Sequence, residues 1–215
     1  MNKGAGVPKR TRRPSTQAAR DRILEIAEQV IAKDSPVEFQ LQEVAQRLGV
    51  KAPALYNHFR GRDDLVGQVS ARGNHEIYEV MERKAGEDFW TWIRRAVRDL
   101  VTLLAQRPAI ARLILWDIAH GDVDTWGEEA VERDREFLGT MERHFEEARR
   151  LGLIRNIRFE HFHSYMYSGI SGSLLFHSIY PDAKMAEISV LQDEAEDFVV
   201  RMLRREPDRS GPESQ

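Results

Sequence analysis

The sequence predicts an all-α protein with a small N-terminal domain of three helices and a larger C-terminal helical domain, about nine helices in total. Three observations carry this prediction. Apolar residues recur at helical spacing through most of the 215 residues, glycine and proline separate the repeats, and no stretch alternates convincingly in the manner of a strand. We expect four segments: an arm over 1–16, the N-terminal domain over 17–62, the C-terminal domain over 63–206 and a frayed tail over 207–215.

The N-terminal domain contains three apolar repeats separated by clear breakers. Residues 16–33 carry the first repeat, and Asp34-Ser35-Pro36 is expected to end that helix. Residues 41–48 carry the second, which ends at Gly49, a residue suited to a left-handed C-terminal cap. Pro53 fits the first turn of a third helix, because its missing N–H costs nothing there.

A fourth helix follows after Gly61. Asp63 and Asp64 suit its positive N-terminus, and its apolar positions continue to Met81. Because this helix starts directly after the third one and reaches into the larger domain, we expect it to act as a mechanical link between the two. Further helices are expected at about 89–106 with a break at Pro108, and at about 110–119, 128–150 with a cap at Gly152, 159–180 before Pro181, and 187–205.

Composition excludes several classes of protein. The chain has 41% hydrophobic and 31% charged residues, enough for a sizeable core, and it has no cysteine for a disulfide or a thiolate zinc site. Its apolar stretches are far shorter than the roughly 20 residues of a membrane span. The first residues also lack the apolar run of a signal peptide. These features favour a cytoplasmic protein that does not enter a membrane.

Charge is divided unevenly along the chain. Residues 1–62 contain twelve Lys or Arg and six Asp or Glu, a net charge of +6, so the remainder carries -9 out of the total of -3. A basic end on an acidic body is typical of a protein that approaches phosphates with one end. The five basic residues of the arm, with no acid among them, favour a disordered DNA-contacting arm; a solubilising terminus without contacts is the alternative.

Two short helices joined by a turn at Gly49 have the spacing of a helix-turn-helix, in which the second helix enters the major groove. Spacing alone also describes any helical hairpin. The residues are more specific: Gly49-Val50-Lys51-Ala52-Pro53-Ala54-Leu55-Tyr56-Asn57-His58-Phe59, followed by Arg62 and Leu65. This stretch resembles the recognition helix of the TetR family of bacterial transcriptional regulators, and the resemblance extends over about residues 19–69.

The resemblance implies an operator-binding domain followed by an effector-binding and dimerisation domain whose last two helices form a four-helix bundle in the homodimer. Tyr56 and His58 are expected to donate hydrogen bonds to phosphates, and Arg62 to supply a positive charge there. Asn57 and Gln42 are the candidate base readers, since an amide can pair with adenine. The remaining expected DNA-binding residues lie at or beside the start of the recognition helix: Lys51, Ala52, Pro53 and Ala54.

Two positions depart from the family pattern. Gln40 stands where a threonine commonly caps the second helix, so this cap is expected to be poorer or to come from another residue. Leu41 stands where some members have a polar phosphate contact, which suggests that this contact is missing here.

The C-terminal domain carries scattered aromatic and soft apolar side chains. One interpretation is a pocket for a largely apolar small-molecule effector; the other is ordinary helical core. His161 and His163 point about 200° apart on a helix and cannot share a metal ion. His163 and Tyr167 share a face, where they could line the polar end of a pocket or make an interhelical hydrogen bond. The candidate effector-binding residues are Trp92, Trp116, Phe137, Met141, Phe145 and Tyr165.

Gly169 and Gly172 lie in the middle of an expected helix, where each glycine costs about 1 kcal/mol relative to alanine. Close approach of another helix would compensate, either within the subunit or across a dimer interface. We place both glycines at the expected dimer interface. Because a regulator that addresses two half-sites needs two copies of its reading helix, a homodimer is the natural assembly.

The leading hypothesis is a sequence-specific DNA-binding regulator, a repressor that a small-molecule effector releases from its operator. It requires no catalytic residue, cofactor or metal. One alternative is a DNA-binding regulator controlled by a protein partner. Another is a small-molecule-binding or catalytic helical protein that does not bind DNA, although the sequence has no nucleophile and base signature, phosphate loop or metal cluster to support it.

Overall fold

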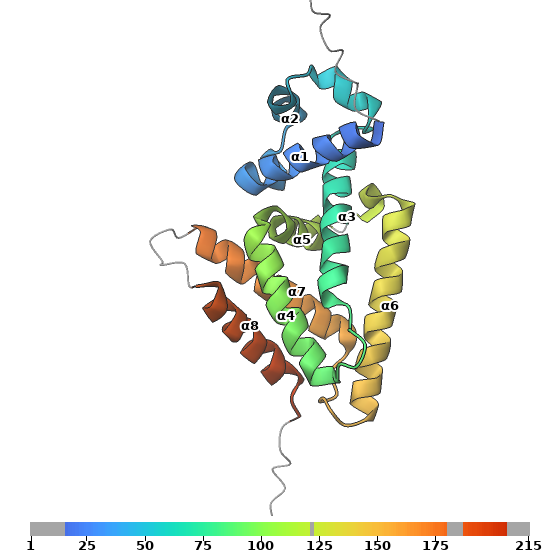
Figure 1. The fold of residues 1–215 in the computed structure, drawn as a ribbon, viewed down its shortest axis with the longest axis vertical. Helices are drawn as coiled ribbons and strands as arrows, with labels where there is room; N and C mark the ends of the chain where they lie inside the picture. Colours follow the sequence, from blue (N-terminus) through green and yellow to red (C-terminus); the bar gives the residue numbers. More distant parts are fainter. Residues whose placement is uncertain (1–15, 121–122, 180–186, 206–215) are drawn as a thin grey trace, which may run out of the picture.

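The computed structural model describes residues 16–120, 123–179 and 187–205, and these residues form an all-α fold, as predicted. The expected arm, up to residue 15, and the expected tail, from residue 207, lie outside the described residues. Figure 1 shows the first helices gathered at one end of the molecule and the remaining helices packed into a larger body. The described elements are α1 (Thr16–Glu38), α2 (Leu41–Leu48), η1 (Ala52–Asn57), α3 (Arg62–Met81), α4 (Phe89–Gln106), α5 (Pro108–His120), η2 (Val123–Trp126), α6 (Glu128–Arg150), α7 (Phe159–Ile179) and α8 (Ile188–Leu203).

Most helix ends agree with the breakers in the sequence. Helix α2 ends at Gly49, which adopts φ 69°, and α6 covers the expected 128–150. Gly152 follows α6 with φ 70°. These are the left-handed conformations in which glycine carries no steric penalty. Within the described ranges, no helix is both long enough and apolar enough to cross a membrane.

The prediction that α1 stops at Pro36 is wrong, because the helix continues to Glu38 with Pro36 inside it. A helix leaves its last carbonyl groups without partners. Here the Arg62 guanidinium donates to the carbonyl oxygens of Pro36 and Val37 and, from Nε, to that of Phe39 at 3.2 Å. These bonds stabilise a final turn that the local sequence disfavours.

The sequence predicts that Pro108 separates two helices, but in the structure it lies within the second of them. It is the first residue of α5, which therefore begins two residues before the expected position 110. A proline at this position loses no helical hydrogen bond, since the first N–H groups of a helix have no partner within it. Only Arg107 separates α4 from α5.

Two helices extend from the core of the N-terminal end into the core of the larger body. Helix α3 contributes Leu65 to the first core and Ile77 to the second. Helix α5 does the same over a shorter distance, with Leu113 in the first core and Ile114 in the second. Figure 1 shows the long helix α3 running between the two ends of the molecule, with α5 packed beside it. The expected link through α3 is thus accompanied by a second one through α5.

Arg107 adds a polar connection at the same junction. Its Nε donates to Glu28 of α1 at 2.6 Å, its Nη2 donates to the same carboxylate at 2.5 Å, and its Nη1 donates to Glu76 of α3. All three side chains are at most 27% exposed. One guanidinium therefore ties the loop between α4 and α5 to both α1 and α3.

Candidate nucleic-acid interface and ligand cavity

The turn between α2 and η1 is shaped by Gly49. Its N–H binds the carbonyl of Gln46 at 3.1 Å, and the N–H of Val50 binds the carbonyl of Ala45 at 3.0 Å, which is the six-residue closure of a Schellman cap. A Cβ at Gly49 would meet no atom within 4 Å. Glycine is therefore favoured by the positive φ and not by lack of space.

Element η1 is a six-residue 3-10 helix with Pro53 in its first turn. Leu55 and Phe59 are buried and anchor this segment to the core. Arg20 of α1 holds the end of the segment: its Nη1 donates to the carbonyl of His58 at 2.5 Å, and its guanidinium carbon lies 4.4 Å from the centre of the Phe59 ring. These contacts hold the segment against the core, and its opposite face is exposed to solvent.

The structure exposes five of the nine residues expected to contact DNA: Gln42, Lys51, Pro53, Tyr56 and Asn57. The Tyr56 ring is 59% exposed although tyrosine carries a large apolar ring. The other four, Ala52, Ala54, His58 and Arg62, are half-buried. Exposed amide, ammonium and phenol groups on one short turn and helix form a surface able to bind phosphates and base edges.

The guanidinium of Arg62 is engaged with the protein itself. Besides the α1 carbonyls it contacts Asp63, with Nη1 to Oδ1 at 2.6 Å, and its side chain is 33% exposed. A phosphate contact would compete with these bonds. Gln40 makes no side-chain cap bond at the start of α2, as its departure from the family pattern predicted.

The positive charge of the N-terminal end is concentrated outside the described residues. Residues 16–62 contain seven Lys or Arg against six Asp or Glu, whereas residues 1–15 contain five basic and no acidic side chains. Within the described part, Arg47 pairs with Glu43 at 2.5 Å and Arg60 with Asp64 at 3.5 Å. The described helix-turn-helix is therefore nearly neutral, and residues 1–15 carry five of the six net positive charges of residues 1–62.

A cavity of about 190 Å³ lies in the larger body. Helices α3, α5, α6 and α7 and the short η2 surround it. The described lining residues are Asn74, Ile77, Tyr78, Ile114, Asp117, Ile118, Trp126, Asp134, His163, Ser164 and Tyr167. Because α3 and α5 also reach the core of the N-terminal end, the cavity touches both connections to the helix-turn-helix.

Two carboxylates in the lining already accept hydroxyl donors. Tyr78 donates to Oδ1 of Asp134 at 2.6 Å, and Ser70 donates to Oδ2 of Asp117. Burial raises the pKa of Asp134, and burial together with the bond to Asp134 raises the pKa of Tyr78. Both shifts favour the protonated forms, so the Tyr78 phenol keeps the proton that it donates to Asp134.

The other polar groups considered in the lining are a neutral imidazole and two buried donors. Burial lowers the pKa of His163 to about 4, so its imidazole is neutral near pH 7. The Tyr167 hydroxyl and the Trp126 indole N–H are buried, and neither finds a hydrogen-bond partner among the described residues. His163 and Tyr167 lie 4.5 Å apart between ring centres, and both line the cavity, as their shared helix face allowed.

The six residues expected to bind an effector lie elsewhere. Trp92 is fully buried and donates from Nε1 to the carbonyl of Met81 at 2.8 Å. Met141 and Phe145 belong to the same core, and Phe137 stacks on Tyr78 with 4.3 Å between ring centres. Trp116 stacks on His120, and Tyr165 is 63% exposed. None of the six is among the described lining residues of the 190 Å³ cavity.

Sequence reasoning did not select most of the residues that line this cavity. Asp134 and Trp126 come from elements far from α7 in the chain, and no local pattern marks them as partners of His163 or Tyr167. The shared helical face of His163 and Tyr167 is the one signal the sequence offered. Among the described residues, no group of three His, Cys, Asp or Glu side chains could hold a metal ion.

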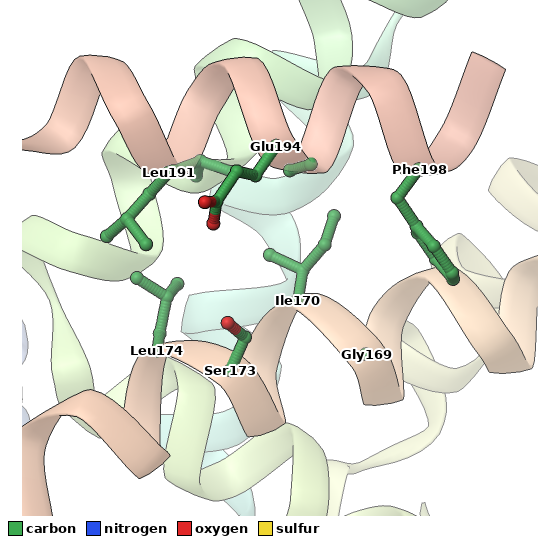
Figure 2. Close-up of a pocket in the computed structure, with 9 residues that line it drawn as sticks. Gly169, Ile170, Ser173, Leu174, Leu191, Glu194 and Phe198 are labelled. Atoms are coloured by element: carbon green, nitrogen blue, oxygen red, sulfur yellow. The ribbon is translucent and has the colours of Figure 1, made fainter. Parts of the chain in front are cut away.

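A second hollow of about 240 Å³ separates α7 from α8. Figure 2 shows Ile170 and Leu174 of α7 facing Leu191 and Phe198 of α8, with the Glu194 carboxylate directed into the gap. A Cβ at Gly169 would lie 3.7 Å from the Phe198 ring, an ordinary contact, and a Cβ at Gly172 would meet nothing within 4 Å. Packing among the described residues therefore requires neither glycine.

Large apolar side chains remain exposed on these two helices: Tyr165, Phe176, Ile188, Val190 and Phe198. Burial of such side chains against another helix would be favourable. The exposed apolar side chains, the hollow between the helices and the two uncrowded glycines make α7 and α8 suitable for a close helical partner.

Comparison with known proteins agrees with this geometry. The profile described as "Bacterial regulatory proteins, tetR family" matches residues 23–69, which span most of α1, the helix-turn-helix and the start of α3. Comparison with curated proteins by sequence gives no match.

Solved structures with the same fold cover nearly the whole chain. A bacterial regulatory protein of the TetR family from Rhodococcus RHA1 is similar with a TM-score of 0.67 and 17% identity, over 88% of this chain and 98% of that one. A TetR-family transcriptional regulator from Haemophilus influenzae gives a TM-score of 0.64 at 12% identity, over 90% and 100% of the two chains. The fatty acid degradation regulator FadR from Bacillus halodurans gives 0.63 at 15% identity, over 88% and 96%.

Proposed function

We propose that this chain, a DNA-binding transcriptional regulator of the TetR family, is a cytoplasmic repressor that binds its operator as a homodimer and is released by a small molecule. The observation that carries the proposal is the exposed set on α2 and η1, where Gln42, Tyr56 and Asn57 project from a segment anchored by Leu55 and Phe59. These side chains have no role in the core, and their chemistry suits a nucleic acid.

The proposed contacts divide into positioning and reading. Tyr56 donates to a phosphate from its exposed ring, Lys51 supplies charge, and His58, the half-buried residue directly after η1, donates to a second phosphate oxygen. Asn57 and Gln42 read base edges, because an amide presents a donor and an acceptor side by side. Arg62 contributes mainly by holding the end of α1.

The proposed dimer forms through α7 and α8. Their exposed apolar side chains would be covered by the same helices of a second copy, in a two-fold contact. The open space at Gly172 allows a partner helix to approach closely. Replacing Phe198, which is 47% exposed, with glutamate should give monomers in sedimentation, whereas a wild-type protein that is monomeric at micromolar concentration would contradict this assembly.

Release of DNA requires that the effector bind one dimer geometry better than the other, since equal affinity for both shifts nothing. The 190 Å³ cavity is the proposed site. Ile114 and Asp117 of α5 line it, while Ala109 and Leu113 of the same helix pack in the core of the helix-turn-helix end. A coupling free energy of about 1–3 kcal/mol would lower operator affinity about 5- to 150-fold.

The test begins with selection of a duplex operator from a random library, followed by anisotropy titrations at several salt concentrations. Wild-type affinity should fall steeply with salt, because bound phosphates release counterions. Tyr56→Phe should weaken binding to every duplex about 10-fold or more through loss of one hydrogen bond to a charged group. Gln42→Ala and Asn57→Ala should change base preference.

Thr140→Val is the matched control, since it removes an exposed hydroxyl from α6, outside both the helix-turn-helix and the proposed dimer contact. It should leave DNA affinity unchanged. Equal and salt-insensitive affinities of wild type and Tyr56→Phe would contradict the proposed DNA contact.

A further inference from the structure

We infer that the 190 Å³ cavity takes an uncharged, largely apolar molecule of one or two rings that carries a hydrogen-bond acceptor such as a carbonyl oxygen, and that Tyr167 and Trp126 donate to this acceptor. That such a molecule acts as the effector rests on the proposed function. That it binds in the cavity rests on the cavity alone.

The unpartnered donors carry the inference. The Tyr167 side chain is 6% exposed and Trp126 is 7% exposed, yet the phenol hydroxyl and the indole N–H have no partner among the described residues. A buried donor without a partner costs about 1–3 kcal/mol, and native proteins contain few of them. An acceptor placed in the cavity by a guest would recover this free energy at both groups.

The charges of the lining argue for an uncharged guest. The described lining contains two aspartates and neither lysine nor arginine. A carboxylate or phosphate guest would be desolvated beside Asp117 and Asp134 without a counter-charge. His163 offers none, because its imidazole is neutral near pH 7.

A cationic guest fits less well than an uncharged one. Asp117 and Asp134 already accept hydrogen bonds from the hydroxyl groups of Ser70 and Tyr78. An ammonium group has no acceptor and would leave the donors of the cavity as they are. The groups of the lining that lack a partner among the described residues are donors, and they require an acceptor.

The volume of the cavity limits the guest to about the size of one or two rings. The volume of about 190 Å³ corresponds to the space of about six liquid waters at ~30 Å³ each. Ile77 and Ile114 are buried and provide apolar walls. Ile118 and Ser164 line the cavity and are exposed, so the cavity reaches the surface beside them.

Four naphthalene probes test this inference on the full-length protein without DNA. They share one frame and differ in one group: 2-acetonaphthone carries a carbonyl acceptor, naphthalene carries no polar group, 2-naphthoate is an anion and 2-naphthylmethylammonium is a cation. The Trp126 indole N–H resonance, identified by its loss in Trp126→Phe, reports occupancy. We expect 2-acetonaphthone to shift this resonance and to bind about 5-fold or more tightly than each of the other three.

Two variants, each of which loses one hydroxyl, separate a binding role from a structural one. Tyr167→Phe should weaken 2-acetonaphthone about 5-fold and leave naphthalene unchanged, while the melting temperature of the free protein stays equal or rises because an unpartnered hydroxyl has been removed. Thr140→Val, which removes an exposed hydroxyl from α6, should change none of these values.

Each other outcome overturns part of the reasoning. Tighter binding of the anion or the cation refutes the charge argument, and no binding of any probe refutes the site. A lower melting temperature in Tyr167→Phe means that the hydroxyl has a structural partner. If 2-acetonaphthone binds as expected but leaves operator affinity unchanged, the site stands and the release mechanism fails; loss of salt-dependent DNA binding would instead contradict the proposed function alone.

Discussion

Replacing Arg107 with methionine should weaken the connection between the two ends of the molecule. The substitution keeps most of the apolar stem and removes the guanidinium that binds Glu28 of α1 and Glu76 of α3. Those two carboxylates would then face each other without a cation. Glu28, whose side chain is only 15% exposed, would bear most of the desolvation cost.

The expected loss follows from the burial of the cluster. Breaking a fully buried ion pair costs about 3–5 kcal/mol. The side chains of Arg107 and Glu76 keep about a quarter of their surface in water, at 26% and 27%, which reduces the estimate to about 2–3 kcal/mol. For a chain of this size, that loss lowers the melting temperature by about 4–12 °C.

Scanning calorimetry at fixed protein concentration provides the measurement. Arg22→Met is the matched control, because Arg22 pairs with Glu25 on α1 and both side chains are well exposed, at 61% and 45%. It should shift the transition by about 1–2 °C or less. A double-mutant cycle with Glu28→Gln isolates the coupling across the junction. An Arg107→Met transition as close to wild type as that of the control would refute the reasoning.

Three further predictions concern packing, protonation and charge. In Gly67→Ala the new Cβ would lie 2.5 Å from the carbonyl oxygen of Thr125, so thermal unfolding should show a loss of about 1–3 kcal/mol, whereas Gly139→Ala, with 3.7 Å to its nearest neighbour, should be neutral or stabilising. An unfolded histidine binds a proton below about pH 6.5, whereas folded His163 resists protonation until about pH 4. The stability from His163 is therefore complete above pH 6.5 and lost as the pH falls towards 4, up to about 3 kcal/mol; urea titrations of His163→Phe should show a flatter dependence, and a parallel curve would contradict the assignment. Deleting residues 1–15, which carry five basic side chains, should reduce the salt slope of DNA binding by up to ~4, and an unchanged slope would exclude the arm from the interface.

Local signals explain why helices and the DNA-reading segment could be predicted from the sequence. The φ of Gly49, the extent of α6 and the burial of Leu55 and Phe59 depend on residues within a few positions of each other. Helical periodicity and capping act over this same distance. The motif around η1 could therefore be located, and its exposed side chains follow from its anchors.

Other features depend on side chains that are distant in the chain. Pro36 lies inside α1 because Arg62 supplies donors to the last carbonyls of that helix. Trp92 is a large aromatic residue of the kind that lines ligand pockets. Its indole N–H nevertheless donates to the carbonyl of Met81, and its ring fills the core. No local pattern distinguishes a core aromatic from a binding one, since the difference lies in which partner satisfies its polar atom.

The sequence by itself determined the helices, their breakers and the helix-turn-helix, because these follow from periodicity and caps within a few residues. The tertiary structure alone decided the 190 Å³ cavity, where Tyr167 of α7, Trp126 of η2 and Asp134 of α6 meet residues of α3 and α5. Only the packed structure shows that Asp134 accepts a hydrogen bond from Tyr78, whereas the Tyr167 hydroxyl and the Trp126 indole N–H have no partner among the described residues. Hydrogen-bond satisfaction is a property of the packed neighbours of an atom, and those neighbours are chosen by the fold.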